Sequence, residues 1–538
     1  MQGLMQDVPL NIPGLIHHAA KLHPRKTVTT KTADGKKTAT FAQVIERSRK
    51  LATALRGLGV KDHERVATLS WNHQEHLEAY IAAPCMGAVL HTLNLRLFPD
   101  DIAYIVQHAE DRVLIIDKCL WPLWEKVAPK VTCVRDIIVV DDVGGPKIPG
   151  THDYEELIAD VEPIDYALDL PERQAAAMCY TSGTTGHPKG VVYSHRSNVL
   201  HSYALSLVDC FGLSERDVSI LVVPMFHANA WGLGQSGPMI GAKLVMPGGK
   251  MDGASIYELL DTEKVTFTAA VPTVWLMLLG YLEETGRKLP YLKKVVIGGS
   301  ACPRAMTKKF QENYDVEVIH AWGMTEMSPL GTLGTMKPET ADLSGDAKLD
   351  LQQKQGFAPF GVEMKVTDDA NREHPWDGKT FGRLKVRGPA VASSYYGGAG
   401  AEQFDAEGWF DTGDVAHVDP DGYMQITDRA KDVIKSGGEW ISTIDLENLA
   451  VGHPDVAEAA VIGVAHPKWD ERPLLVIVRK PGKEPSKTDI LGYMDGKVAK
   501  WWMPDDVAFV AEIPHTATGK IQKTTLRDQF RDYKLPTG

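Results

Sequence analysis

The sequence predicts an α/β protein with a large N-terminal domain, made of α/β subdomains and a β-rich subdomain, and a small α+β domain at the C-terminus. Short apolar runs alternate with longer amphipathic ones over the first 430 residues, which is typical of parallel sheets flanked by helices. Residues 381–422 change to short strands and turns. A charged junction at 428–432 precedes a new set of strands and helices, enough for a separate domain.

The expected strands of the N-terminal domain are short and largely apolar, and lie at 65–70, 113–117, 136–140, 176–180, 219–223, 243–246 and 295–297. Amphipathic spacing predicts helices at 41–58, 75–86 and 256–263. The apolar stretch 267–282 is interrupted by Pro272 and passes from strand-like to helix-like residues, so we expect buried core there rather than a membrane span. The C-terminal strands are expected at 459–464, 474–478 and 506–510.

The composition is that of an ordinary folded protein with a net negative charge. Of 538 residues 43% are apolar and 24% charged, and 58 basic against 70 acidic residues give a formal net charge of −12. A general nucleic-acid binder needs a basic face, so we expect no nucleic-acid partner, although small nucleotides remain possible ligands. Six cysteines without a CxxC pair favour a reducing compartment, and we expect a cytoplasmic protein with no signal peptide or transmembrane segment.

One loop, residues 180–190, is rich in groups that bind phosphate. It follows an expected strand and precedes a helix expected from Ser194 onward. Its glycines allow tight turns that expose backbone amides, its hydroxyls add donors, and its lysine adds a cation. These residues are Thr181, Ser182, Gly183, Thr184, Thr185, Gly186, Lys189 and Gly190. The spacing differs from the Walker pattern, because Gly183 and Gly186 are too close together and Lys189 is followed by glycine.

The loop and four later motifs resemble those of the acyl-adenylate-forming superfamily, the AMP-dependent synthetases and ligases. The later motifs, in the expected order, are Ala321-Trp322-Gly323-Met324-Thr325-Glu326, Gly408-Trp409-Phe410-Asp411-Thr412-Gly413-Asp414, the junction from Asp428-Arg429 to Glu447, and Pro514-His515-Thr516-Ala517-Thr518-Gly519-Lys520. Trp322, where many members have tyrosine, and Asp428-Arg429, where many have Gly-Arg, resemble the medium- and long-chain fatty-acyl-CoA synthetase branch.

The resemblance implies an acid–thiol ligase that uses ATP, Mg²⁺ and coenzyme A. A carboxylic acid first attacks the α-phosphate of ATP to give acyl-AMP and pyrophosphate, and CoA then takes the acyl group. The implied catalytic residues are Lys520, Glu326, Thr325 and His227, and the implied Mg²⁺ ligands are Glu326 and Thr185. The implied nucleotide contacts are the loop residues, Gly299, Ser300, Ala301, Trp322, Gly323, Asp414 and Arg429, the last two on the ribose.

The resemblance also implies a mobile C-terminal domain. The expected boundaries are an AMP-binding domain at 1–428, a hinge at 429–431 centred on Lys431, and a lysine-bearing domain at 432–538. Rotation about the hinge would withdraw Lys520 and bring in a loop for the CoA step. That loop is formed by Lys435, Gly437, Gly438, Glu439 and Trp440.

The acid should bind near residues 224–232, after the strand expected at 219–223. His227 resembles a family residue near the substrate carboxylate, and Trp231 resembles a tryptophan that gates an acyl tunnel. The alternative for Trp231 is an ordinary core position. A medium- or long-chain fatty acid is the expected substrate, with a short or substituted acid, such as methylmercaptopropionate or a cinnamate-like acid, as the alternative.

Other functions share these motifs. An adenylation enzyme that loads a carrier protein, and a luciferase-type oxygenase, would both need the adenylation residues. A catalytically silent nucleotide-binding scaffold would not need Lys520, Glu326 and Asp414 together. A metalloenzyme finds no support, since the nineteen histidines show no HExxH or paired Cys/His spacing. A homodimer is compatible with the sequence but not indicated by it.

Overall fold

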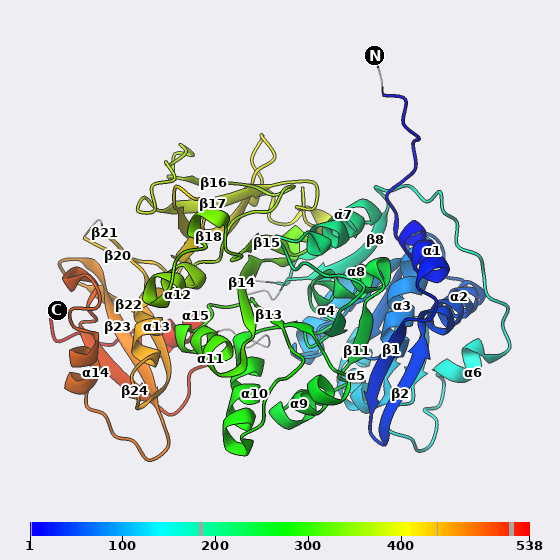
Figure 1. The fold of residues 1–538 in the computed structure, drawn as a ribbon, viewed down its shortest axis with the longest axis horizontal. Coiled ribbons are helices and arrows are strands. Elements are labelled where there is room, and N and C mark those ends of the chain that lie inside the picture. The colour runs from blue at the N-terminus through cyan, green and yellow to red at the C-terminus, as the bar shows by residue number, and fades with distance from the viewer. Residues whose placement is uncertain (2, 182–186, 438, 516–520, 538) are drawn as a thin grey trace.

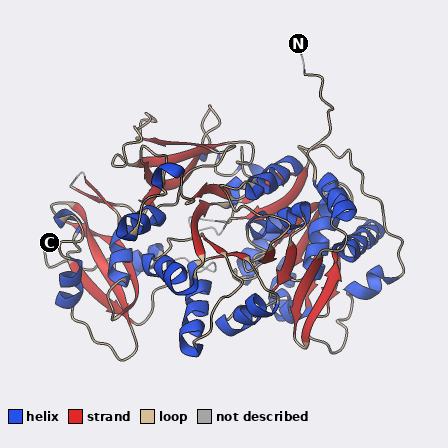
Figure 2. Ribbon diagram, in the orientation of Figure 1, coloured by secondary structure: helices blue, strands red, loops and turns tan. Residues whose placement is uncertain are grey.

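The computed structural model describes residues 1, 3–181, 187–437, 439–515 and 521–537 (Figure 1). Two largely parallel sheets form the N-terminal part, a four-stranded antiparallel sheet follows, and a separate sheet forms the C-terminal part at the opposite end from β1 and β2. Helices pack around these sheets, as Figure 2 shows. The predicted fold class, a large N-terminal domain with a small C-terminal one, is therefore confirmed.

The first sheet has the order β7-β6-β5-β3-β4-β8-β9, and all its pairs are parallel except β8–β9. Its strands are β3 (Arg65–Leu69), β4 (Val89–Thr92), β5 (Asp111–Asp117), β6 (Asp136–Val140), β7 (His152–Asp153), β8 (Ala175–Tyr180) and β9 (Gly190–Ser194). Buried valine, leucine and isoleucine fill the central strands, as expected for strands covered on both faces.

The second sheet has the order β15-β14-β13-β12-β10-β11-β1-β2, with antiparallel pairs only at its two edges. Its strands are β1 (Thr27–Thr32), β2 (Gly35–Thr40), β10 (Val218–Ile220), β11 (Lys243–Met246), β12 (Phe267–Ala270), β13 (Lys294–Ile297), β14 (Glu317–Gly323) and β15 (Leu330–Leu333). Because most strands run parallel, their carboxyl ends meet along one edge, where α/β proteins usually bind ligands.

Helices of the N-terminal part begin and end at recognisable signals. Thr40 and Gln43 form a capping box at the start of α2, and Pro272 occupies the first turn of α10. The helices are α1 (Ile12–Leu22), α2 (Phe41–Gly57), α3 (Gln74–Cys85), α4 (Pro99–Ala109), α5 (Trp121–Val127), α6 (Tyr154–Ala159), α7 (His195–Ser206), α8 (Leu233–Ile240), α9 (Gly253–Thr262), α10 (Pro272–Thr285), α11 (Arg304–Tyr314) and α12 (Gly345–Gln353).

The antiparallel sheet and the C-terminal sheet lie one after the other in the chain. The antiparallel sheet has the order β16 (Glu363–Thr367), β17 (Gly382–Arg387), β18 (Phe410–Val418) and β19 (Met424–Arg429). The C-terminal sheet contains β20 (Ile434–Ser436), β21 (Glu439–Ile441), β22 (Val456–His466), β23 (Asp470–Arg479) and β24 (Asp506–Val510), covered by α13 (Thr443–Val451), α14 (Lys487–Met494) and α15 (Lys523–Gln529).

The C-terminal sheet buries side chains on both faces. Leu475 and Ile477 of β23 pack into one apolar cluster with residues of α13 and α14, while Leu474 and Val476 pack into another with Leu526 of α15. Two cores of its own make this region a separately packed unit. The predicted boundary at 428 and hinge at 429–431 stay predictions.

One local expectation holds with an addition, and one needs correction. The helix expected from Ser194 onward is α7, with Ser194 as its N-cap, and residues 190–194 form β9, which pairs with β8 as a hairpin between this helix and the phosphate-type loop at 180–190. The strand expected at 219–223 ends at Ile220, because the next backbone carbonyls accept hydrogen bonds from Asn72 instead of a neighbouring strand.

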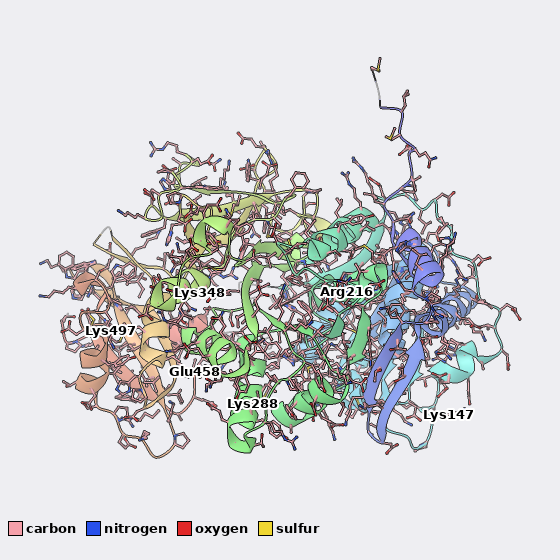
Figure 3. All side chains as sticks on the ribbon, in the orientation of Figure 1. Lys147, Arg216, Lys288, Lys348, Glu458 and Lys497 are labelled. Carbon is pink, nitrogen blue, oxygen red and sulfur yellow. The ribbon has the colours of Figure 1, made fainter. Side chains whose placement is uncertain are left out.

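The other expected strands and helices agree with the structure to within a few residues. The apolar stretch 267–282 forms β12 and the start of α10, with Trp275 fully buried. Within the described ranges, no helix combines the length and apolar character needed to cross a bilayer. Exposed charged side chains such as Lys147, Lys288 and Lys497 lie on the outside of both halves (Figure 3).

His320 in β14 gives the fold a defined acid sensitivity. Its side chain is 3% exposed, and its Nδ1 lies 3.0 Å from the carbonyl oxygen of Gln353. Burial lowers the pKa of His320 from 6.5 to about 4, so the unfolded chain binds an extra proton between these values. The neutral imidazole therefore makes its full contribution to the free energy of unfolding above pH 6.5, and this contribution is lost as the pH falls toward 4.

We predict that His320→Gln weakens the pH dependence of unfolding between pH 6.5 and 4. The contribution at stake is roughly 3 kcal/mol, at about 1.4 kcal/mol per pKa unit. Urea unfolding at pH 7, 5.5 and 4.5 measures it, with the exposed His17→Gln as the matched control. An unchanged slope in His320→Gln would contradict a buried neutral histidine.

Candidate active site

A cavity of about 410 Å³ lies at the carboxyl-end edge of the two parallel sheets. Loops after β4, β8, β10, β12, β13 and β14 contribute to its wall, and β18, β19 and the segment after β19 close one side. Twelve of the residues singled out in the sequence line it, namely Thr181, Lys189, His227, Trp231, Gly299, Ser300, Trp322, Gly323, Thr325, Glu326, Arg429 and Lys431. Residues more than 200 positions apart in the chain thus meet in one place.

Asp414 lies beside this cavity, held by two donors. The Trp322 indole Nε1 donates to its Oδ2 at 3.0 Å, and the Arg429 Nε lies 2.9 Å from its Oδ1. Asp414 and Arg429 face each other in the β18–β19 ladder, which explains why residues fifteen apart in sequence form an ion pair. Asp414 is only 2% exposed, so both oxygens need these partners.

Glu326 follows β14 in a 3-10 turn, Thr325–Met327, and is buried. The hydroxyl of Tyr395 donates to its Oε1 at 2.5 Å, and burial raises the pKa of the Glu326 carboxyl. The hydroxyl of Tyr193 donates to the carbonyl of Thr325 at 2.7 Å and fixes the same turn. Among the described residues that line the cavity, Glu326 is the one that carries a carboxyl group.

Tyr395 lies between Lys189 and Glu326 and contacts both side chains. The Lys189 ammonium lies 4.9 Å from the centre of the Tyr395 ring and donates to the Gln403 Oε1 at 2.6 Å. Its backbone amide donates to the Thr181 hydroxyl at 3.1 Å, which closes the base of the phosphate-type loop. A cation is therefore held at the cavity wall, beside the loop that was expected to bind phosphate.

The segment 224–232, where the acid is expected to bind, has an unusual backbone. Four residues in succession, from Ala228 to Trp231, have φ between 43° and 53°, and Gly232 follows at 79°. Left-handed conformation costs an L-residue about 1–2 kcal/mol each, so neighbouring contacts must hold this turn. The Trp231 ring lies against Gly298, where a built Cβ would come within 3.2 Å of the indole Cη2. Trp231 is half-buried and faces the cavity.

Asn72 positions the chain that leads into this turn. Its Nδ2 donates to the carbonyl oxygens of Leu221 and Val223 at 2.7 and 2.8 Å, and its Oδ1 accepts from the amide of Met225 at 2.8 Å. The Tyr80 hydroxyl donates to the carbonyl of Met225. His227 and Trp231 therefore project from a segment that is fixed at its start.

Several expected residues lie elsewhere or outside the described part of the chain. Ala301 follows Ser300 but is not in the cavity wall, and the same holds for Lys435 and Gly437, which belong to β20 and its turn. Gly437 has φ +58° and lies against the Trp469 ring. The backbone of Glu439 and Trp440 forms part of β21. Ser182, Gly183, Thr184, Thr185, Gly186, Gly438 and Lys520 fall outside the described residues.

The end of β19 is anchored to the C-terminal unit. The Asp428 carboxylate accepts from the amide and hydroxyl of Thr443, at 2.7 and 2.6 Å, and buried Lys523 pairs with Glu447 at 2.7 Å. Burial raises the pKa of both Asp428 and Glu447. These contacts lie immediately next to the predicted hinge.

Sequence reasoning missed Tyr395, Tyr193, Gln403 and Asn72. Tyr395 and Gln403 lie in a loop between β17 and β18, about 70 residues after Glu326, with no spacing that ties them to it. Asn72 follows β3 and acts on a segment 150 residues later. The only sequence signal is position after a strand, since Asn72 and Tyr193 lie at or just after strand ends.

Comparisons with known proteins agree with this geometry. The family model described as AMP-binding enzyme matches residues 16–396, and the AMP-binding enzyme C-terminal domain matches residues 445–520. The chain is 47% identical to the 3-methylmercaptopropionyl-CoA ligase of Ruegeria lacuscaerulensis, over 99% of both chains. It is also 47% identical to the long-chain-fatty-acid–CoA ligase of Thermus thermophilus, over 98% of this chain and 97% of the other.

A solved structure shares the architecture. The anthranilate CoA ligase AuaEII in complex with anthranoyl-AMP superposes with a TM-score of 0.86 at 28% identity, over 98% of this chain and 99% of that chain. The matched family models cover both the cavity-forming part of the chain and the C-terminal unit. By sequence and by fold, the chain belongs to the AMP-binding enzyme family.

Proposed function

We propose that this protein is an ATP-dependent acyl-CoA ligase. A carboxylic acid and ATP give acyl-AMP and pyrophosphate, and CoA then gives the acyl-CoA and AMP. The observation that carries the proposal is one cavity lined by Glu326 and Lys189, by Arg429 of the Asp414 pair, and by His227 and Trp231. This chemistry requires the residues that bind the nucleotide and those that bind the acid to line one cavity, because the reacting carboxylate and α-phosphate must come into contact.

The nucleotide would bind at the Asp414 end. A carboxylate can accept two hydrogen bonds from the vicinal hydroxyls of a ribose, and Arg429 beside it would orient the acceptor oxygens. Gly299, Ser300 and Gly323 present backbone at the cavity wall, where the flat adenine and the phosphates could approach closely.

Glu326 would hold Mg²⁺, together with Thr185. The fit rests on the buried carboxylate at the cavity wall, since magnesium prefers oxygen ligands and carboxylates. The ion would supply charge neutralisation at the triphosphate. Tyr395 orients the Glu326 carboxylate by donating to Oε1, and this hydrogen bond opposes the rise in the Glu326 pKa that burial causes. Lys189 adds a second positive charge near the phosphate-type loop.

Lys520 would stabilise charge on the reacting carboxylate and α-phosphate in the first half-reaction. The C-terminal unit would then rotate about Lys431, so that the loop containing Gly437 and Gly438 faces the cavity for the CoA step. Asp428 immediately precedes the predicted hinge and accepts hydrogen bonds from Thr443 of the C-terminal unit, so these bonds would link the two domains across the hinge. A cytoplasmic location, which six free cysteines would suit, is part of the proposal; a homodimer remains a prediction.

Two classes of acid are candidates. A medium- or long-chain fatty acid follows from the resemblance of Trp231 to a tunnel gate, and a short thioether acid follows from the relative that is named for 3-methylmercaptopropionate. The two named relatives are equally similar to this chain, at 47% identity, so identity favours neither class. Loading of a carrier protein would use the same acyl-AMP and differs only in the acceptor.

The proposal is tested by separating the half-reactions in Lys520→Ala. Pyrophosphate release from ATP with acids from acetate to palmitate should fall roughly 10²- to 10³-fold, the usual scale for losing one electrostatic stabiliser. Thioester formation from supplied acyl-AMP and CoA should survive much better. Exposed Lys534→Ala is the control and should behave as wild type. Absence of CoA-dependent thioester in the wild type would overturn the ligase assignment.

Tyr395→Phe should weaken the Glu326 site. Removal of the hydroxyl raises the pKa of the carboxyl further, so the acidic limb of the pH–rate profile should move to higher pH. A hydrogen bond to a charged group is worth about 1.5–3 kcal/mol, which corresponds to a loss of roughly 10- to 150-fold in kcat/KM, with a raised Mg²⁺ requirement. The neighbouring Tyr396→Phe removes a hydroxyl without a hydrogen bond to any described residue. Equal effects of both variants would contradict the role of Tyr395.

Trp231→Ala should change the preference among acids. If the indole closes an acyl tunnel, kcat/KM for butyrate, octanoate and palmitate should shift relative to one another, because each buried methylene contributes about 0.8 kcal/mol. The KM for ATP should stay nearly constant. A core tryptophan behaves differently. Its loss would cost roughly 3–5 kcal/mol of stability and lower activity on every acid alike, which a thermal melt measured beside the kinetics would reveal.

A further inference from the structure

Aromatic side chains from distant parts of the chain meet beside the phosphate-type loop. Tyr104 and His108 lie one turn apart on the same face of α4, and their rings stack with centroids 5.4 Å apart and an angle of 15°. Tyr180 ends β8 at the start of the loop, and His187 belongs to the last part of the loop. The steps proposed above use neither of the two α4 residues.

The two α4 side chains contact both described ends of the loop. The His187 ring stacks on the Tyr104 ring, with centroids 4.6 Å apart and an angle of 25°. The His108 Nδ1 lies 2.6 Å from the Tyr180 hydroxyl, and the two rings meet edge to face at 5.8 Å. Each end of the loop is therefore held by one residue of α4.

The same face of α4 reaches the segment that carries Tyr395. The His108 ring meets the Tyr396 ring edge to face at 5.4 Å, and a Cβ built on Gly397 would lie 3.3 Å from the His108 Nε2. Tyr395, the residue before, donates to Glu326. His108 therefore lies against both the loop and the segment that orients the proposed Mg²⁺ ligand.

The held residues stand next to groups that face the cavity. Tyr180 is followed directly by Thr181, and His187 lies two residues before Lys189. Thr181, His187 and Lys189 all line the cavity. Because groups that bind a reacting phosphate act well only when they are held to within about 0.5 Å of the productive geometry, supports at both ends of the loop should matter to its ligand.

The attachment of α4 to the first sheet does not depend on these two rings. Ile102, Ile105 and Val106 of the helix are buried in one apolar cluster with residues of β5. Tyr104 and His108 are only half-buried, and both rings point their contacts at the loop and the segment after it in space. The two side chains are therefore available to support the loop.

We propose that Tyr104 and His108 are positioning residues for the triphosphate of ATP, which act through Tyr180 and His187 on the phosphate-type loop. The inference rests on the proposed function and goes beyond it, because neither residue is in the cavity wall. AMP and acyl-AMP carry no β- or γ-phosphate. The contribution of the two residues should therefore apply to ATP and pyrophosphate and spare AMP and the acyl-adenylate.

The first test measures ATP and AMP binding by titration calorimetry, with Mg²⁺ and without acid. Tyr104→Leu removes the stacked ring and should raise the Kd for ATP roughly 2- to 12-fold for each ring pair lost, while the Kd for AMP stays near wild type. Tyr104→Phe keeps the ring and should bind both nucleotides as wild type does. Tyr281→Leu is the matched control, because it breaks the ring pair of Tyr281 with Tyr257 away from the cavity and should change neither Kd.

The two half-reactions give a second readout. In His108→Ala the KM for ATP in pyrophosphate release should rise, while thioester formation from supplied acyl-AMP and CoA keeps its wild-type rate. Tyr180→Phe removes the hydrogen bond to His108 but keeps the ring contact, so its effect should have the same direction and a smaller size.

The inference is overturned if Tyr104→Leu leaves ATP binding unchanged. It is also overturned if the variant weakens ATP and AMP equally, or slows both half-reactions alike with a lowered melting temperature, as loss of a merely structural contact would. Wild type that binds ATP and yet forms no acyl-CoA from any acid would instead count against the ligase function.

Discussion

One buried carboxylate joins two of the sheets, at the point where the chain leaves for the C-terminal unit. Asp414, on the antiparallel sheet, takes a donor from Trp322 at the end of β14 in the second parallel sheet and another from Arg429, the last residue of β19. An ionised carboxylate this far from water is tolerable only while both oxygens are bonded. Loss of either donor would therefore disturb the other sheet as well as the cavity wall, and the chain leading to the C-terminal unit starts from the same point.

In the part of the cavity where the acid is proposed to bind, backbone strain is offset by local contacts. Its left-handed turn is unfavourable for four L-residues, and the surrounding structure compensates with specific contacts. Asn229 within the turn accepts a hydrogen bond from the Cys179 thiol at 3.2 Å, and the amide of Ala230 bonds back to the carbonyl of His227. The turn places the Trp231 indole against Gly298 in the cavity wall.

Local patterns in the sequence were enough for much of this picture. Apolar runs identified β5, β6, β11 and β24 almost to the residue, and glycine-rich motifs after strands pointed to the cavity, because both signals act over a few neighbouring residues. The hairpin β8–β9 was missed because residues 190–194 pair with a strand across the loop, which local periodicity does not report. The early end of β10 has the same kind of cause, since it is decided by the distant side chain of Asn72.

The partners of the site residues were beyond sequence reasoning for a similar reason. Tyr395 reaches Glu326, and Tyr104 reaches His187, only once the sheets and helices have packed. Motif matching names residues that act on ligands, whereas these side chains orient or surround them. The roles of residues 182–186 and Lys520 were predicted from their motifs alone, and they stay predictions.

Asn72 has a consequence for how acid preference can vary among proteins of this shape. Its three hydrogen bonds, and that of Tyr80, all go to main-chain atoms of residues 221–225. Hydrogen bonds to main-chain atoms can form whichever side chains the segment carries. Substitutions in this segment can therefore reshape the wall without releasing the backbone path, and a chimera that exchanges residues 221–232 should retain its geometry as long as Asn72 and Tyr80 stay with the recipient.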